Sequence, residues 1–191
     1  MRKMLVLLAA VALQSVGMQA EAQEPINIKF SHVAATDTPK GQGAERFKKL
    51  AEERTKGRVK VTVYANSALF KDKEELEALQ MGSVQMLAPS ISKFGPFGVK
   101  EFEVFDLPFV TPDLASFQQV TTSEYGQQLL KRLDARGVRG LAYWDAGFRV
   151  ISSNRPLHKL ADFKGMKIRV NSSKVIEAQT RAVGAIPQTL A

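Results

Sequence analysis

The stretch Gly165-Met166-Lys167-Ile168-Arg169-Val170 decides the fold class of this 191-residue chain. Its apolar residues alternate with Lys167 and Arg169, which predicts a strand with one buried face and a guanidinium on the other. A helix is expected to follow, with Ser173 as its N-cap. Open α/β sheets bind ligands where a strand end meets a helix start, and the free amides of the helix favour an anion there. From this pattern alone Arg169 is either an anion ligand or a solvated arginine, and the solvated arginine is the commoner case.

The chain before this stretch alternates between strand and helix patterns. Strands are expected over 26–30, 59–64 and 84–88, with helices over 39–56 and 72–81 between them. Asp72 is expected to cap the second of these helices. This β-α-β-α-β order predicts a largely parallel sheet with helices packed on its faces.

Later segments extend the α/β pattern. Strands are expected over 101–110, 138–144 and 148–152, and a long helix over 123–136 ends at Gly137. The helix over 173–183 is followed by the approach to a further strand. We therefore expect a βαβ unit that opens at Gly165 and is not closed within the chain.

Residues 1–22 have the pattern of a secretory signal peptide. A basic start, Met1-Arg2-Lys3, precedes an apolar run over 4–13, and Ala20-Glu21-Ala22 matches a cleavage site. The absence of cysteine suits a bacterial periplasm, and no later stretch approaches the length of a membrane span. We expect a periplasmic protein that is not inserted in the membrane once the signal is removed.

The net charge of +8 raises nucleic acid and membrane surfaces as partners, but both require clustered charge. The cations here alternate with Asp and Glu along the predicted helices, which is typical of solvated helix faces and fits attraction of small anions equally well. The two histidines, His32 and His158, lack the spaced partners of a metal site or a catalytic triad. His32 is interpreted as a satisfied core histidine. No phosphate-binding or dinucleotide motif occurs, so we expect no nucleic acid partner, no cofactor and no enzymatic activity.

Several segments, in order and spacing, resemble the solute-binding subunit of tripartite ATP-independent periplasmic (TRAP) transporters, the DctP-like family. Together they cover the chain after the signal. The matching segments are 28–33, 75–80 with Gly82, Ser90-Ile91-Ser92-Lys93-Phe94, Phe105-Asp106-Leu107-Pro108-Phe109, Gly147-Phe148-Arg149, Ser153-Asn154-Arg155-Pro156 and 162–170.

The resemblance implies a two-domain periplasmic binding protein-like (Venus flytrap) α/β fold around a cleft. Domain I is expected over 23–145 and the start of domain II over 146–191. Relatives in this family continue past Ala191, so the second domain is expected to be incomplete in this chain. The implied function is capture of an organic acid, with a C4-dicarboxylate favoured, and its delivery to TRAP permease subunits in the membrane. The alternatives are a sugar acid, keto acid or sialic acid, a non-functional fragment, or an exported enzyme acting on anionic substrates.

The resemblance also implies the site residues. Arg169 corresponds to the family's main carboxylate ligand and Arg149 to a second arginine ligand. Ser90 and Lys93 lie in a loop that lines the cleft in relatives. Arginine suits this role because its planar fork matches a carboxylate, whereas lysine offers a point charge. Lys93 is either a contact for a second acidic group or a solvated loop lysine.

The signal interpretation predicts that the exported chain begins at Gln23 or within one or two residues of it. Mass spectrometry of the protein recovered from the periplasm measures this directly. An exported chain that still carries Met1 would contradict the predicted cleavage.

Overall fold

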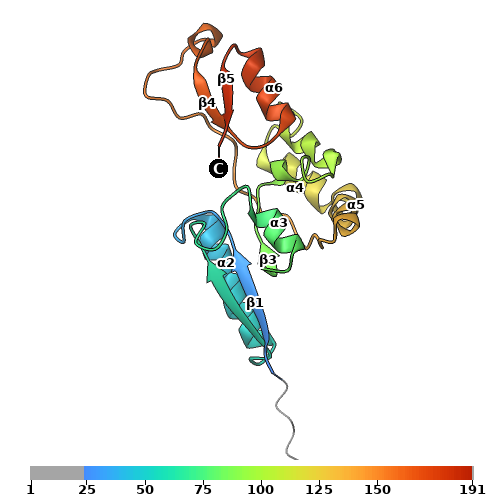
Figure 1. Ribbon diagram of the computed structural model, residues 1–191. Coiled ribbons are helices and arrows are strands. Elements are labelled where there is room, and N and C mark those ends of the chain that lie inside the picture. Colours follow the sequence, from blue (N-terminus) through green and yellow to red (C-terminus); the bar gives the residue numbers. More distant parts are fainter. Residues whose placement is uncertain (1–23, 191) are drawn as a thin grey trace, which may run out of the picture.

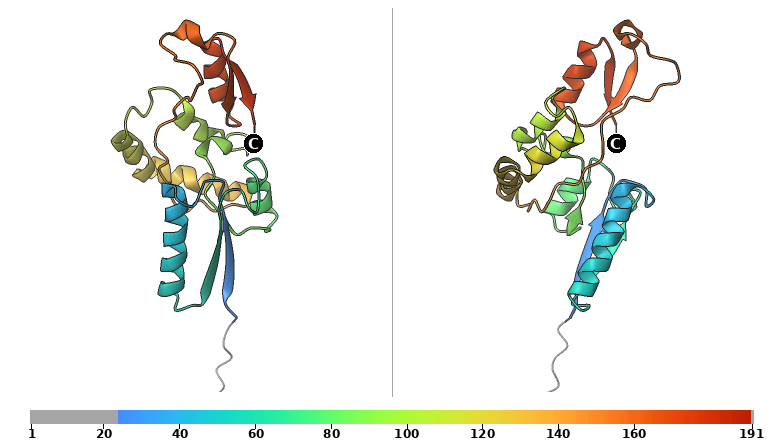
Figure 2. Two further views of the ribbon diagram at one scale, coloured as in Figure 1. Left: turned by 90° about the vertical axis from the view of Figure 1, so that its left-hand side faces the viewer. Right: turned by 180° about the vertical axis from the view of Figure 1, so that it is seen from behind.

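The computed structural model describes residues 24–190 and has two small parallel sheets with helices between and beside them (Figures 1 and 2). The predicted signal peptide lies outside the described residues. The first sheet has the order β2-β1-β3, formed by β1 (Ile26–Ser31), β2 (Val59–Tyr64) and β3 (Met86–Leu87). All of its pairings are parallel. The predicted α/β class is therefore confirmed.

Helix α2 (Pro39–Arg54) packs on the first sheet and forms its core. Thr38 caps the helix by accepting a hydrogen bond from the amide of Gly41 at 3.2 Å, and Pro39 fits the first helical position. Phe30 from β1 is almost fully buried and meets Phe47 of α2 edge to face at 5.7 Å between ring centroids. These contacts hold β1 against the helix, so the carboxyl end of the strand has a fixed position.

A group of short helices lies between the two sheets (Figure 1). Val99 and Phe102 are buried with Leu129 and Leu133 and form a second core. The members of the group are α3 (Glu75–Gln80), η2 (Ile91–Lys93), η3 (Lys100–Asp106), α4 (Leu114–Thr122), α5 (Glu124–Lys131) and η4 (Arg132–Arg136), where η marks a 3₁₀ helix.

The second sheet pairs β4 (Lys167–Val170) with β5 (Ile186–Thr189). Helix α6 (Lys174–Ala182) connects the two strands, and the short η5 (Leu160–Phe163) precedes β4. Exposed and buried positions alternate along β4, and Ser173 caps α6, both as predicted. The expectation of an unclosed βαβ unit was wrong, because β5 pairs with β4 in parallel register. This unit presents Arg169 at its strand end.

Four local predictions were also wrong. Residues 101–110 are not a strand, because Phe102 and Phe105 are three residues apart and face the second core from the turns of η3. The segments 138–144 and 148–152 form no strands, because the described residues supply no neighbouring strand to accept their backbone hydrogen bonds. Asp72 does not cap α3, whose N-cap is Glu74 without a side-chain hydrogen bond.

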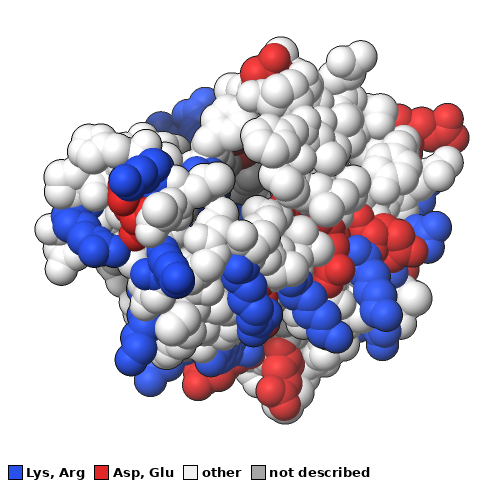
Figure 3. Space-filling model, turned by 90° about the horizontal axis from the view of Figure 1, so that it is seen from above, with Lys and Arg blue, Asp and Glu red and all other residues white. Residues whose placement is uncertain are grey.

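Helix length and the distribution of charge in the described residues bear on binding to membranes and to nucleic acid. Within residues 24–190 no helix is both long and apolar enough to cross a bilayer. On the face shown in Figure 3, Lys and Arg side chains are spread out and interleaved with Asp and Glu. Nucleic acid binding requires clustered positive charge, and this face does not provide it.

His32 follows β1 and is fully buried, but it is not the satisfied core histidine that the sequence indicated. Neither ring nitrogen has a hydrogen-bond partner among the described residues. Burial lowers the pKa of the imidazole below its usual value, and the nearby Lys40 ammonium lowers it further. His32 is therefore held as the neutral imidazole in the folded protein, while the unfolded chain binds a proton more readily.

This difference predicts a loss of stability on acidification. The folded-state pKa of His32 lies below the unfolded value near 6.5. The contribution of the neutral imidazole to the unfolding free energy is therefore complete above about pH 6.5 and is lost as the pH falls through the folded pKa. Replacing the imidazole in His32→Gln should reduce the fall in unfolding free energy between about pH 7.5 and 5.5. Urea unfolding at the two pH values measures it, with the exposed His158→Gln as the matched control. An undiminished pH dependence in His32→Gln would exclude this role.

Candidate functional site: an arginine pair around the η2 turn

The segment 90–93, here called the η2 turn, connects all four residues predicted for the site. It begins shortly after β3, with Ser90 as the N-cap of η2, so the first sheet lies next to it in the chain. Ser90, Ser92 and Lys93 each contact a different segment of the chain through their side chains. The turn is therefore the point at which residues distant in sequence meet.

Arg169 lies in β4 and reaches back toward the first sheet. Its Nη1 donates a hydrogen bond to Asn171 Oδ1 at 2.9 Å, and its Nη2 lies 3.9 Å from Asp72 Oδ2. Asn171 in turn donates to Ser90 Oγ at 3.1 Å, which links the end of β4 to the η2 turn. The Arg169 side chain is 49% exposed, so its remaining donors are accessible to a ligand.

Arg149 reaches the same turn from an irregular segment, not from the strand expected over 148–152. Its Nη2 donates to Ser92 Oγ at 3.2 Å and lies 3.4 Å from Asp106 Oδ1. The side chain is 50% exposed. Two half-exposed guanidinium groups, here called the arginine pair, are thus anchored to one turn. Arg149 contacts Ser92 directly, and Arg169 is linked to Ser90 through Asn171.

Lys93 is a buried, paired residue of the η2 turn. Its side chain is only 7% exposed, and its ammonium pairs with Glu75 Oε1, with Asp72 Oδ1 at 2.6 Å and with the Asp72 carbonyl. An ammonium has three donors, and these three acceptors match that number. Lys93 is therefore not a solvated loop lysine. Its predicted contact with a second acidic group would require one of these bonds to be exchanged.

Four residues of the site were not identified as site residues from the sequence. Ser92 and Asp106 hold Arg149, whereas Asn171 and Asp72 contact Arg169. Ser92 and Asp106 lie within segments that carry the family resemblance, which was the available signal. The sequence predicts Asp72 only as a helix cap, and Asn171 lies just after the strand predicted at Gly165, so neither was expected to contact a distant residue or Arg169.

Positive charge exceeds negative charge around the η2 turn. Lys40 also points here, since its ammonium donates to the Ala88 carbonyl at 2.9 Å. Desolvation lowers the pKa of Lys40 and raises the pKa of the fully buried Glu75, where Lys93 opposes the rise. The group has four cations and three carboxylates and thus favours one additional anion: Lys40, Lys93, Arg149 and Arg169 against Asp72, Glu75 and Asp106.

Further hydrogen bonds near the η2 turn join the part of the chain that contains the second sheet to the part that precedes it. Gln179 of α6 donates to the Asp106 carbonyl, and Lys73 donates to the Thr189 carbonyl of β5 at 3.2 Å. Together with the Asn171 contact to Ser90, these bonds border the arginine pair. A ligand bound by Arg149 and Arg169 would therefore lie at the junction of the two sheet regions.

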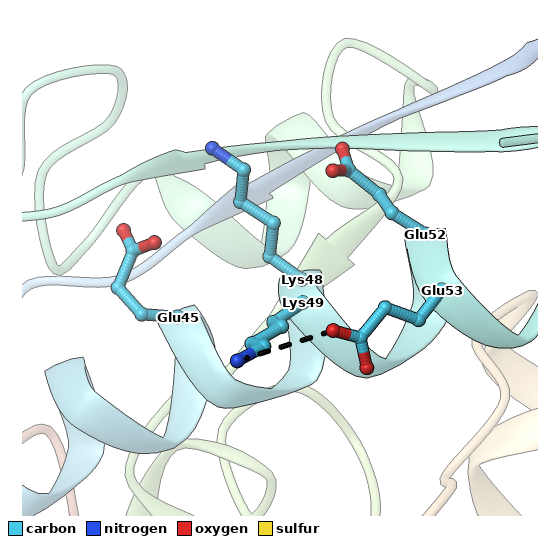
Figure 4. Close-up of a pocket in the computed structure, with 5 residues that line it drawn as sticks. All are labelled: Glu45, Lys48, Lys49, Glu52 and Glu53. Atoms are coloured by element: carbon cyan, nitrogen blue, oxygen red, sulfur yellow. Dashed lines mark ion pairs between the residues drawn. The ribbon is translucent and has the colours of Figure 1, made fainter.

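A shallow surface pocket of about 420 Å³ lies elsewhere, on α2 (Figure 4). Acidic and basic side chains of that helix alone line it, and Lys49 pairs with Glu53 at 3.9 Å. Such an exposed ion pair contributes little to stability, and side chains from one helix cannot surround a ligand. We therefore place the candidate site at the η2 turn.

The relatives of the chain agree with the resemblance seen in the sequence. The chain is 59% identical over 168 residues to the C4-dicarboxylate-binding periplasmic protein DctP of Rhodobacter capsulatus, a match that covers 88% of this chain and 50% of the relative. It spans about half the length of that curated relative.

Two solved structures are similar in fold. A TRAP periplasmic solute-binding protein from Pseudomonas aeruginosa with bound L-malate is 48% identical at a TM-score of 0.84, and the match covers 87% of this chain and 58% of that one. A sugar acid binding protein from Advenella mimigardefordensis in complex with galactonate is 32% identical at a TM-score of 0.81, with 86% and 54% covered. The family model described as bacterial extracellular solute-binding protein, family 7 (DctP) matches residues 30–191. This chain belongs to that family of solute-binding proteins.

Proposed function

We propose that this protein binds an organic acid, with a C4-dicarboxylate as the favoured ligand, between Arg149 and Arg169. The observation that carries the proposal is the arrangement of these two half-exposed guanidinium groups around the η2 turn. Arginine presents donors in a planar fork that matches a carboxylate in two-pronged contacts. The excess of cations over carboxylates in the same group favours an anionic ligand as well.

Free donors support the proposed contact. A guanidinium has five N–H donors, and Arg169 uses Nη1 for Asn171, while its Nη2 is beyond hydrogen-bonding distance of Asp72. Arg149 directs only Nη2 to Ser92 and Asp106. Ser90 and Asn171 add neutral polar groups beside the arginines. In this proposal Ser90 orients the ligand, and Lys93 holds the η2 turn in place through its buried ion pairs.

The ligand class follows the gradient of similarity among relatives. Identity is 59% to the C4-dicarboxylate-binding relative and 48% to the malate-bound structure, and it falls to 32% for the galactonate-bound one. A sugar acid is therefore the second candidate. Comparing the affinities for succinate, L-malate and galactonate by calorimetry separates the two ligand classes, and tighter binding of galactonate would favour the sugar acid.

The wider role proposed here is that of a periplasmic binding protein that delivers its ligand to TRAP permease subunits. The family is one of extracellular solute-binding proteins, which supports a binding role and not a catalytic one. The signal pattern over 1–22 supports export. Domain I over 23–145 and domain II from residue 146 remain the proposed boundaries. Incubation with succinate followed by product analysis tests the enzyme alternative, and any turnover would contradict the binding role.

The proposed two-pronged contact predicts the effect of substitutions at Arg169. Arg169→Lys keeps the charge but loses the planar fork, and a hydrogen bond between charged groups is worth about 1.5–3 kcal/mol. Calorimetric titration with succinate should therefore show affinity weakened roughly 10- to 100-fold. Arg169→Ala should weaken it more, since the carboxylate loses its counter-charge.

A matched control comes from another exposed arginine. Arg139 pairs with Asp134 at 2.8 Å, away from the η2 turn, so Arg139→Ala should leave the dissociation constant unchanged. Unfolding temperatures without ligand should be similar for all variants, because neither arginine is part of the core. Equal dissociation constants for the wild type, Arg169→Lys and Arg169→Ala would remove Arg169 from the site.

A further inference from the structure

Asp106 lies where three separate segments of the chain meet. Its Oδ1 accepts a hydrogen bond from Ser92 Oγ at 2.6 Å and lies 3.4 Å from Arg149 Nη2. Its backbone carbonyl accepts from Gln179 of α6. The η2 turn, the segment carrying Arg149 and helix α6 are thus joined at the last residue of η3.

The Asp106 carboxylate is almost completely withdrawn from solvent. Its side chain is 1% exposed, and Oδ2 is buried without a hydrogen-bond partner among the described residues. An unpaired buried acceptor costs free energy, so this oxygen favours a donor placed close to it. The two oxygens of a carboxylate match two donors of one guanidinium, and the Arg149 guanidinium already faces this carboxylate.

The backbone around Arg149 does little to orient its side chain. Residues 138–159 contain neither helix nor strand, and Phe148 and Val150 on either side of Arg149 are exposed. A long side chain on such a segment has many accessible rotamers, and ordering it costs conformational entropy. Within residues 24–190, the side-chain hydrogen bonds of the guanidinium are those with Asp106 and Ser92, and they give it a defined place.

We propose that Asp106 is the positioning residue for Arg149. Its carboxylate holds one edge of the Arg149 guanidinium. The N–H donors on the opposite edge are then ordered before the ligand carboxylate binds to them. This role rests on the proposed function, in which Arg149 binds the acid. Preorganisation of this kind improves affinity because the cost of ordering the side chain is met before the ligand arrives.

Asp106→Asn tests the role with little change in shape. The amide oxygen can still accept from Ser92, and the Gln179 contact uses the backbone, so the variant removes chiefly the charge that holds Arg149. Titration with succinate should show affinity weakened about 10-fold. Asp106→Glu should restore part of the loss, because it returns the carboxylate. Ser92→Ala is the second variant if Asp106→Asn does not fold, and it should weaken binding less.

A double-mutant cycle separates positioning from a general structural role. In an Arg149→Ala background, Asp106→Asn should cause no further loss of succinate affinity, because the residue through which it acts is gone. The same fold-loss in both backgrounds would overturn the proposal. Tighter binding by Asp106→Asn would overturn it too, since it would show that Asp106 competes with the ligand for Arg149.

Nitrogen-15 NMR of the arginine side chains gives a readout without ligand. The Arg149 guanidinium should rotate slowly in the wild type and fast in Asp106→Asn, while Arg139, paired with Asp134, stays unchanged. Equal Arg149 mobility in both proteins would overturn the positioning role. An Arg149→Ala variant with wild-type affinity would instead contradict the proposed function at Arg149, and the NMR comparison would still decide whether Asp106 orders it.

Discussion

The buried Lys93 ammonium, paired with Glu75 and Asp72, is the interaction on which the arginine pair depends. Removing one partner of such a pair leaves an uncompensated charge in the interior, which costs about 3–5 kcal/mol. The pairing therefore holds the η2 turn firmly, and Ser90 and Ser92 of that turn hold the groups around the two arginines. Asp72 pairs with Lys93 through Oδ1, and its Oδ2 lies 3.9 Å from Arg169 Nη2. That distance is too long for a hydrogen bond, so the contact leaves the N–H donors of Arg169 free.

The same arrangement places the arginines near the contacts between the two sheet regions, which the proposed ligand would therefore affect. The bonds that cross between the two sheet regions lie around the same site. A carboxylate bound to both arginines would add to these few polar contacts, so its binding free energy would favour the arrangement in which both arginines reach it. Excluding water from such a site strengthens each charge-assisted bond. In the proposed function, ligand binding and coupling between the two regions would both depend on this one set of contacts.

Local sequence patterns predicted the elements that depend on local physics, and the others needed information from distant residues. Caps and apolar alternation located α2, β1, β4 and α6. They failed over 138–152, where the pattern requires a partner strand that the described chain does not supply. At the site, spacing could not bring Arg149 and Arg169 to one turn, and only the family resemblance suggested it. Local patterns did not indicate the contact between Asp106 and Arg149, because the two residues are 43 positions apart in the sequence.

A crystal structure of the protein with saturating succinate tests the central claim, that two arginines anchored at the η2 turn bind one acid together. The account predicts a succinate carboxylate within hydrogen-bonding distance, about 2.7–2.9 Å, of both the Arg149 and the Arg169 guanidinium groups. It also predicts that Lys93 remains paired with Glu75, since the buried pair supports the turn in either state. Succinate bound away from the η2 turn, or held there without a contact to either arginine, would contradict the account.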